Sequence, residues 1–334
     1  MNRVNLRRKL AELEPLQMGS FPTPMQPLIR LSQWLAGPEI WIKRDDLDGL
    51  GGGGNKIRKL NFLLAQAIRQ GADIVLTTGA TQSNHARQTA AMAARLGMAC
   101  RLVLQGDGPP PEASGNYLLD RLLGAEIRWT RGEEPMKAME QEASDLREKG
   151  RTPFIIPYGG SNAMGIMGFV AAFREFIAQS AADGLPFDTI VIASSSGGTQ
   201  AGLTLGAKAL GWPGEIIGVS IADPKAILVE RMVALANEGA ELLGLDFRLH
   251  ARDFHVSDAF LGGGYGVVGR LEREAIRTLA RVEGIFVDPV YTGRALGGLM
   301  EMIRSGDLRE AKRILFWHTG GIPAIYAHHR ELLR

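Results

Sequence analysis

One stretch decides how this chain is organised, Leu50-Gly51-Gly52-Gly53-Gly54-Asn55-Lys56-Ile57-Arg58-Lys59-Leu60. Four consecutive glycines bury no side chain and lose much backbone entropy on folding, so the backbone must bend or approach another group closely here. The apolar residues that follow Lys56 predict a helix, which places this lysine near a helix N-terminus. That end carries partial positive charge, so we expect the Lys56 amine to lose its proton more easily than a surface lysine.

A neutral lysine amine is a nucleophile that can form a Schiff base with a carbonyl compound. The stretch alone fits equally well a flexible glycine loop followed by two solvated lysines, Lys56 and Lys59. A phosphate-binding loop of the Walker type is excluded, because that motif requires Ser or Thr directly after its lysine and Ile57 stands there.

The composition is that of a globular protein large enough for two domains: 334 residues, 45% hydrophobic and 22% charged. A net charge of +2 and the lack of a long basic run predict no nucleic-acid or membrane partner. The single cysteine, Cys100, lies in an apolar run and is expected to be a buried structural thiol. Because there is no signal-like segment and no apolar run of membrane-spanning length, we expect a cytoplasmic enzyme or binding protein.

Predicted strands alternate with predicted helices along most of the chain. The expected strands are residues 39–43, 73–78, 100–104, 126–129, 154–156, 189–193, 215–220, 285–287 and 313–317. Helices are expected at 86–96, 116–123 and 136–149, and the run 189–193 has the composition of a strand buried on both faces. This alternation predicts an α/β fold with two open, mostly parallel sheets flanked by helices, divided near residue 160.

Ligands of such sheets bind at the carboxyl ends of the strands, where loops enter helices. The loop from Ser194 to Gly202 joins a predicted strand to a helix and is rich in small residues and hydroxyls. Its backbone N–H groups and hydroxyls can cradle a phosphate at a helix N-terminus. An ordinary turn in which Thr199 caps the helix remains the alternative. The loop lacks the G-x-G-x-x-G pattern, so a nicotinamide cofactor is not expected.

The loop from Thr81 to Arg87 also leads from a strand into a helix, and its N–H groups and hydroxyl suit a carboxylate. Helix capping by Ser83 or Asn84 fits the same residues, and both interpretations can hold together. Two further loops, 288–294 and 316–321, follow apolar strands, and Tyr265 lies among glycines, where simple packing explains a tyrosine less well.

Together these features resemble the fold type II pyridoxal-phosphate enzymes, and within them the family of D-cysteine desulfhydrases and 1-aminocyclopropane-1-carboxylate (ACC) deaminases. The resemblance extends over nearly the whole chain. The segments that carry it are Pro22-Thr23-Pro24, Ile42-Lys43-Arg44-Asp45-Asp46, Gly53–Leu60, Gln82–Ala90, Gly159-Gly160-Ser161-Asn162, Asp288–Gly293 and His318-Thr319-Gly320-Gly321. It implies a tryptophan synthase β-like fold in a homodimer. Residues 1–48 and 162–334 would form a larger cofactor-binding domain, and residues 49–161 a smaller domain that binds the substrate carboxylate.

The resemblance also implies roles for single residues. Lys56 would hold pyridoxal 5'-phosphate covalently and then move the α-proton of a small amino-acid substrate. The implied catalytic residues are Lys56, Ser83, Tyr265 and Tyr291. The implied substrate-binding residues are Ser83, Asn84 and His85, which face the carboxylate, with Tyr265 and Tyr291. The other implied cofactor contacts are Asn84 at the phenolic oxygen, Lys59, Ser196, Gly197, Gly198 and Thr199 at the phosphate, and Thr292 or Thr319 at the pyridine nitrogen.

The implied reaction is β-elimination from D-cysteine to pyruvate, ammonia and hydrogen sulfide. ACC deaminases have a glutamate where Thr292 stands, and a hydroxyl cannot supply the charge that keeps the pyridine nitrogen protonated. The weaker electron sink suits loss of a good leaving group better than opening of a cyclopropane ring. L-Cysteate sulfo-lyases carry similar motifs, so sulfo-lyase activity, and ACC deamination to 2-oxobutyrate and ammonia, remain alternatives. Two departures bear on the substrate: Tyr158 replaces a small apolar residue, and Gly51-Gly52 lengthens the glycine run.

Two alternatives come from other classes of protein. A non-catalytic pyridoxal-phosphate carrier would keep Lys56 and the phosphate loop but lose the tyrosines, and both Tyr265 and Tyr291 are present. A nucleotide-binding protein that uses the glycine loop would carry no chromophore.

Overall fold

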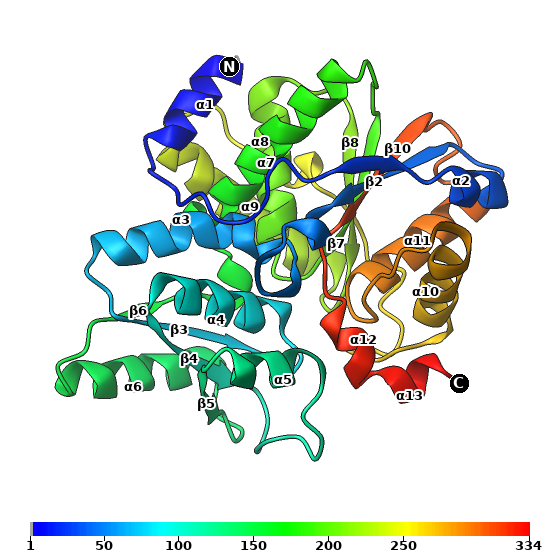
Figure 1. The fold of residues 1–334 in the computed structure, drawn as a ribbon. Helices are drawn as coiled ribbons and strands as arrows, with labels where there is room; N and C mark the ends of the chain where they lie inside the picture. Colours follow the sequence, from blue (N-terminus) through cyan, green and yellow to red (C-terminus); the bar gives the residue numbers. More distant parts are fainter. Residues whose placement is uncertain (1–2) are drawn as a thin grey trace.

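The computed structural model describes residues 3–334 and shows two β-sheets flanked by helices (Figure 1). The larger sheet has six strands in the order β1-β2-β10-β7-β8-β9, and the smaller has four in the order β5-β4-β3-β6. Every strand pair is parallel except β1 with β2. The strands are β1 (Met25–Pro27), β2 (Glu39–Arg44), β3 (Ile74–Gly79), β4 (Ala99–Leu104), β5 (Glu126–Trp129), β6 (Pro153–Ile155), β7 (Thr189–Ser194), β8 (Glu215–Ser220), β9 (His255–Ser257) and β10 (Arg313–His318).

The α-helices cover both sheets. They are α1 (Arg3–Ala11), α2 (Ile29–Leu35), α3 (Lys56–Arg69), α4 (Asn84–Leu96), α5 (Gly115–Leu122), α6 (Pro135–Glu148), α7 (Ala163–Ala182), α8 (Gly198–Leu210), α9 (Lys225–Leu242), α10 (Arg270–Glu283), α11 (Thr292–Arg304), α12 (Pro323–Ala327) and α13 (His329–Leu332). Within residues 3–334, no helix combines the length and the apolar character that crossing a bilayer requires.

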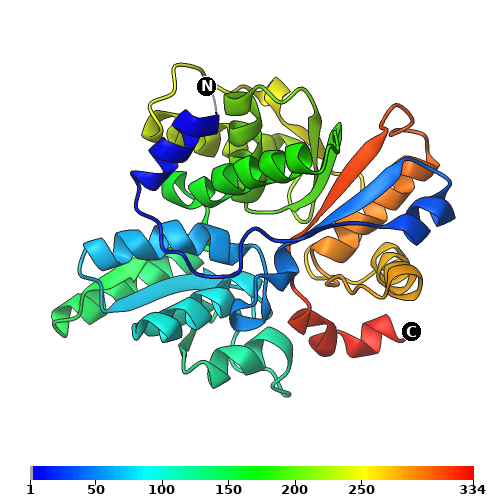
Figure 2. The same ribbon diagram turned by 45° about the horizontal axis from the view of Figure 1, so that its top comes forward.

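The predicted α/β fold with two mostly parallel sheets is confirmed. The four-stranded sheet is built from one continuous part of the chain, coloured cyan to green, which forms one side of the molecule in both views (Figure 1, Figure 2). The strands of the larger sheet come from before and after that part. We therefore keep the division into 1–48 with 162–334, and 49–161, as a proposal that the two sheets support.

The prediction of a strand at 285–287 is wrong. This segment pairs with no strand in the part of the chain that the structure describes. The Phe286 side chain is 53% exposed, and the Phe286 carbonyl accepts a hydrogen bond from His318 Nε2 at 2.9 Å. A side chain thus takes the place of a β-ladder partner. The other predicted strands lie within one residue of the observed ends, whereas the short edge strands β1 and β9 were not predicted.

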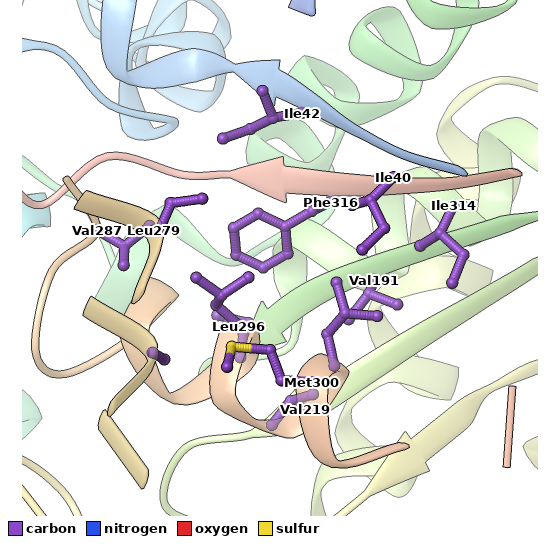
Figure 3. Close-up of a cluster of buried hydrophobic side chains, with 14 of the residues drawn as sticks. Ile40, Ile42, Val191, Val219, Leu279, Val287, Leu296, Met300, Ile314 and Phe316 are labelled. Atoms are coloured by element: carbon purple, nitrogen blue, oxygen red, sulfur yellow. The ribbon is translucent and has the colours of Figure 1, made fainter. Parts of the chain in front are cut away.

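The core of the larger sheet lies on both of its faces, as the composition of β7 predicts. Val191 points into a cluster with Ile40, Ile314 and Phe316, together with residues of α10 and α11 (Figure 3). Ile190 and Ile192 point to the other face, against phenylalanines of α7. Because side chains alternate along a strand, this continuous apolar run is buried on both sides. The sheet therefore holds the loops at its carboxyl edge in fixed positions.

Candidate active site

A cavity with about 590 Å³ of empty space lies at the carboxyl ends of β3, β7 and β10, so loops of both sheets surround it. Its lining residues are Asn55, Lys56, Ser83, Asn84, His85, Tyr158, Gly159, Ala193, Ser194, Ser195, Ser196, Gly197, Thr199, Tyr291 and Thr319. The structure thus brings most of the predicted site residues together around one cavity.

Lys56 is the first residue of α3, as predicted, and it is half-buried in the cavity wall. Burial lowers the pKa of Lys56 to about 8, which agrees with the expected direction. Removal from water disfavours the charged ammonium, an effect that comes in addition to the helix dipole considered from sequence. A large share of Lys56 is therefore neutral near pH 8.

The glycine loop before Lys56 is held by two side chains of α4. Arg87 donates hydrogen bonds to the carbonyl oxygens of Gly51 and Gly53, the second at 2.9 Å. Gln88 donates to the Gly54 carbonyl at 2.7 Å, and its Oε1 accepts from the Lys56 N–H at 3.0 Å. Helix α3 has no side-chain cap from Asn55, so Gln88 satisfies an N–H group that the helix itself leaves unpaired.

Glycine is required in this loop by its geometry. Gly53 has φ of 73°, and a Cβ there would lie 1.9 Å from the Asp46 carbonyl oxygen. The expectation of a close backbone approach is therefore confirmed.

The loop after β7 forms a small cradle at the start of α8. Gly197 has φ of 82°, and a Cβ on Gly198 would lie 2.4 Å from Ser161 Oγ and 2.8 Å from Lys59 Nζ. Ser161 Oγ is in turn 2.8 Å from Ser196 Oγ. Hydroxyls, a helix N-terminus and a lysine therefore converge at this point, which suits a phosphate.

Lys59 belongs to this cradle although it does not line the cavity surface. The side chain is fully buried, and it donates to the Gly159 carbonyl and to Ser161 Oγ, both at 3.0 Å. Burial first, and then the charge of Lys56, hold the pKa of Lys59 well below its usual value. An anion in the cradle would favour the charged form of this amine. At the other side, Asn55 Nδ2 donates to Thr199 Oγ1 at 3.2 Å.

The loop before α4 presents the predicted carboxylate-binding residues. Ser83 is the helix N-cap, since its Oγ accepts from the Ala86 N–H at 3.1 Å, so the capping interpretation is confirmed. Asn116 Nδ2 donates to Asn84 Oδ1 at 2.9 Å. That bond fixes the orientation of the Asn84 amide, whose own NH₂ group has no partner among the described residues and can act as a donor.

His85 is a neutral acceptor. Its Nε2 lies 2.9 Å from Thr77 Oγ1, and that hydroxyl donates to the Ile156 carbonyl at 2.9 Å. Thr77 must therefore accept from Nε2–H, which leaves the buried Nδ1 with a lone pair and no partner among the described residues. Burial, with the charges of Lys56 and then Lys59, keeps the pKa of His85 well below its usual value. A carboxylate here would use backbone N–H groups and Ser83 rather than the imidazole.

The two predicted tyrosines meet at the edge of the cavity. The hydroxyl oxygens of Tyr265 and Tyr291 are 2.6 Å apart, and the rings are arranged edge to face. Only Tyr291 lines the cavity, while Tyr265 lines an adjoining one. Burial raises the pKa of both phenols, so they are neutral and able to donate hydrogen bonds.

The structure separates the two threonines considered for the pyridine nitrogen. Thr292 is fully buried outside the cavity lining, where its hydroxyl donates to Asp288 Oδ1 at 2.7 Å and accepts from the Asp288 N–H at 2.8 Å. Thr319 lines the cavity, and within residues 3–334 its hydroxyl has no hydrogen-bond partner. The geometry therefore favours Thr319 over Thr292 as a group that can face a ligand.

Sequence reasoning gave no role to Arg87, Gln88, Asn116 or Ser161. Three of them lie in or beside the segments that carry the family resemblance, which was the only signal. Their partners are backbone carbonyls and side chains far away in sequence, such as Gln88 with Gly54, 34 residues apart.

Comparison with known proteins agrees with this chemistry. The family described as "Pyridoxal-phosphate dependent enzyme" matches residues 16–320. A D-cysteine desulfhydrase of Yersinia enterocolitica is 40% identical over 334 residues, covering 98% of this chain and 100% of that protein. A Pyrococcus abyssi protein named provisionally as an ACC deaminase is 40% identical over 317 residues, covering 93% and 92%. A solved structure described as an ACC deaminase homologue has a TM-score of 0.91 at 38% identity and 98% coverage of both chains.

Fold, cavity and family match define a pyridoxal-phosphate-dependent enzyme of fold type II. Within that class, the chain belongs to the D-cysteine desulfhydrase and ACC deaminase family, as its motifs predicted. Relatives named for two different substrates are equally similar to this chain. The substrate must therefore be argued from the cavity.

The residues of the cavity fit this cofactor. The Lys56 amine, with a pKa of about 8, can bond to the aldehyde carbon, and the cradle at Gly197 and Gly198 is open only because no Cβ stands there. Asn84 has a free amide donor for the phenolic oxygen. The donor set thus matches the aldehyde, phosphate and phenol groups of pyridoxal phosphate.

Proposed function

We propose that this protein is a pyridoxal-phosphate-dependent carbon–sulfur lyase that eliminates sulfide from D-cysteine, giving pyruvate, ammonia and hydrogen sulfide. One observation carries the substrate argument: among the described residues that line the cavity, none is acidic. Without a carboxylate, nothing in the cavity holds the pyridine nitrogen in its charged form. That favours loss of a good β leaving group over ring opening of ACC. The name of the Yersinia enterocolitica relative supports the same choice.

The cofactor, when bound, supplies an electron sink that no side chain provides. We assign its phosphate to Ser196, Gly197, Gly198 and Thr199 with Lys59 nearby, and its pyridine nitrogen to Thr319, with Thr292 as the alternative. Asn84 would donate to the phenolic oxygen. These assignments rest on the positions of the donors around the cavity.

The protein's own residues then handle the substrate. Lys56 would hold the cofactor until the substrate amine takes its place, and the Lys56 amine released in this way, with a pKa of about 8, would take the proton from Cα. Ser83 and the first-turn N–H groups at Asn84 and His85 hold the carboxylate, and the Ser83 hydroxyl proton remains free to be donated. Tyr291, with Tyr265 behind it, presents a neutral phenol toward the leaving group.

A product assay tests the reaction. Purified protein is incubated with D-cysteine, L-cysteine, L-cysteate and ACC, and sulfide, sulfite, pyruvate and 2-oxobutyrate are measured. We expect sulfide and pyruvate in equal amounts from D-cysteine. Sulfite from L-cysteate would instead support sulfo-lyase activity, and 2-oxobutyrate would support ACC deamination.

Covalent labelling tests the role of Lys56. Borohydride reduction of the yellow holoenzyme followed by peptide mapping should place the label on Lys56. A label on Lys59 or Lys43 would overturn the assignment. Replacing Gly197 with Val should lower cofactor affinity while the fold is retained, because a Cβ there would lie 2.9 Å from the Met232 side chain.

We also propose a homodimer in the cytoplasm. Sedimentation equilibrium of the purified protein checks the subunit number, and a monomer at micromolar concentration would contradict it.

A further inference from the structure

A second cavity adjoins the active-site cavity. It has about 1070 Å³ of empty space by the same measure, against about 590 Å³ for the first, and we call the two the outer and the inner cavity. Both sheets contribute to its wall, which includes Gln105 and Met136 on one side and Asp223 and Arg231 on the other. Within residues 3–334, three residues line both cavities, Tyr158, Ser195 and Ser196. They are therefore the boundary between them.

Tyr158 is the only large side chain in that boundary. It begins a short 3-10 turn, Tyr158–Gly160, in which Gly159 has φ of 64°. A Cβ on Gly159 would lie 2.6 Å from Ser196 Oγ, so the backbone beside Tyr158 is packed tightly against the phosphate cradle. The position of the Tyr158 ring is thus tied to the cofactor site, although the side chain itself is 36% exposed.

The ring also stands beside the other two tyrosines. Burial is the main cause of the raised pKa of Tyr265, and the neighbouring Tyr158 is the next. For Tyr291, burial and then Tyr265 are the main causes, and Tyr158 also contributes. Tyr291 lines the inner cavity and Tyr265 the outer one, and their hydroxyls are joined at 2.6 Å. Tyr158, which lines both cavities and is hydrogen-bonded to Tyr265, therefore lies beside a hydroxyl pair that joins a residue of the inner cavity to one of the outer cavity.

We propose that Tyr158 determines substrate specificity: its ring separates the inner from the outer cavity and restricts the substrates to amino acids with a small β-substituent. This inference rests on the proposed function, because it takes the amino acid to sit beside Lys56 with its carboxylate at Ser83. A substituent longer than the cysteine thiol must then meet the Tyr158 ring. Without the ring, the same substituent extends into the outer cavity.

Two variants separate the bulk of the ring from its hydroxyl. Tyr158→Val removes the ring, and Tyr158→Phe removes the hydroxyl alone. Holoenzyme is titrated with cysteine, S-methylcysteine, S-ethylcysteine and S-benzylcysteine, each as D and L form. Binding is followed by the change in cofactor absorbance, and kcat/KM is measured in parallel.

We expect Tyr158→Val to raise the affinity for S-benzylcysteine relative to cysteine by at least about tenfold, the scale on which apolar pockets discriminate small differences in size. Tyr158→Phe should keep the selectivity of the unmodified protein. An unchanged ratio in Tyr158→Val would overturn the proposal. An equal change in both variants would overturn it too, because the hydroxyl and not the ring would then decide.

Controls separate this inference from the proposed reaction. Tyr326→Val changes a tyrosine that is 67% exposed and lines neither cavity, and it should leave the selectivity unchanged. Tyr158→Ala replaces Tyr158→Val if that variant fails to retain cofactor. A shift in binding selectivity without any elimination product would support the role of Tyr158 and reject the proposed lyase activity. Elimination from D-cysteine with unchanged selectivity in Tyr158→Val would support the lyase activity and reject the role of Tyr158.

Discussion

Two buried arginines near the glycine loop have opposite surroundings. Arg58, on α3, donates to the carboxylates of Asp45 and Glu175 at 2.8–2.9 Å and to Thr23 Oγ1 at 3.0 Å. Arg87, on α4, binds backbone carbonyls of the glycine loop instead. Its Nε atom has no partner among the described residues, and neither do the two carboxyl oxygens of the fully buried Asp120.

The pKa shifts follow from these surroundings. Burial would raise the pKa of Glu175, but the charges of Arg58 and Lys43 outweigh it and lower this pKa to about 2. Around Arg87 burial prevails, raising the pKa of Asp48 and of Asp120 to about 8 and lowering that of Arg87 to about 10.

The difference teaches how the chain divides stability from function. The Arg58 network is a completed set of ion pairs that ties the N-terminal segment and α3 to α7, so it serves the scaffold. The cluster of Arg87, Asp48 and Asp120 contains buried polar atoms without partners, and the hydrogen bonds of Arg87 go to the glycine loop that precedes Lys56. Buried groups without partners are a feature of sites more than of scaffolds.

Removing Arg58 should have the largest effect on stability. Arg58→Met leaves Asp45 and Glu175 buried without their main partner, and breaking a buried pair in this way costs about 3–5 kcal/mol. Urea unfolding measures the loss. Arg69→Met, at an exposed arginine on the same helix, is the matched control, and a loss below about 1 kcal/mol for Arg58→Met would contradict this account.

Removing Arg87 should matter less for stability and more for the loop. Arg87→Met leaves the carbonyls of Gly51 and Gly53 unpaired, for which we expect a loss of about 1–3 kcal/mol. Hydrogen exchange at residues 51–56 should accelerate, and cofactor retention should fall. A stability loss larger than that of Arg58→Met would reverse the comparison.

Asp120 makes the comparison dependent on pH. Its pKa is about 8 in the folded protein against a model-compound value of 3.8, so between these values only the folded state keeps the proton. Stability is therefore fully present below pH 3.8 and is lost as the pH rises toward 8, by up to about 1.4 kcal/mol per pH unit for this group. Asp120→Asn should remove its share of that slope. The exposed Asp183→Asn should leave the slope unchanged, and an unaltered slope in Asp120→Asn would reject the shift.

Gln88 should show the smallest effect on stability and a distinct effect on Lys56. Gln88→Glu keeps the acceptor for the Lys56 N–H, and burial should raise the pKa of the new carboxyl as it does for Asp48 and Asp120, so near neutral pH the protonated group still donates to Gly54 and the loss is about 1 kcal/mol. When this carboxyl ionises at higher pH, its charge should raise the pKa of Lys56 above about 8, so acetylation of Lys56 in cofactor-free protein needs a higher pH. Gln88→Met loses both hydrogen bonds without adding a charge, and an upward pKa shift in that variant as well would exclude the electrostatic cause.

Sequence patterns predicted the fold because strand and helix periodicity are local. The composition of residues 189–193 predicted a strand buried on both faces, and the residues around Lys56 predicted a bent loop followed by a helix. The prediction of a strand at 285–287 was wrong, because the composition of this segment is that of a strand but, among the described residues, the partner of the Phe286 carbonyl is the His318 side chain.

The candidate site was predicted only as far as motifs reached. Lys56, Ser83 and the Ser196–Thr199 loop were found because each has a local pattern. Gln88 and Asn116 were not assigned a role, because their partners are brought near by tertiary structure alone. Thr292 and Thr319 could not be distinguished by sequence, because the difference lies in the hydrogen bonds of Thr292 with Asp288.

The strand order of the larger sheet has a consequence for synthesis of the chain. Strand β10 lies between β2 and β7, and its first residue, Arg313, pairs with Glu39, 274 residues earlier. At 5–20 residues per second, the ribosome makes β10 roughly 14–55 seconds after β2. The four-stranded sheet, complete by Ile155, can form meanwhile. The last strand to be made is thus inserted into the middle of its sheet, and until then the backbone N–H and C=O groups on that edge of β2 are unpaired and can pair with another chain.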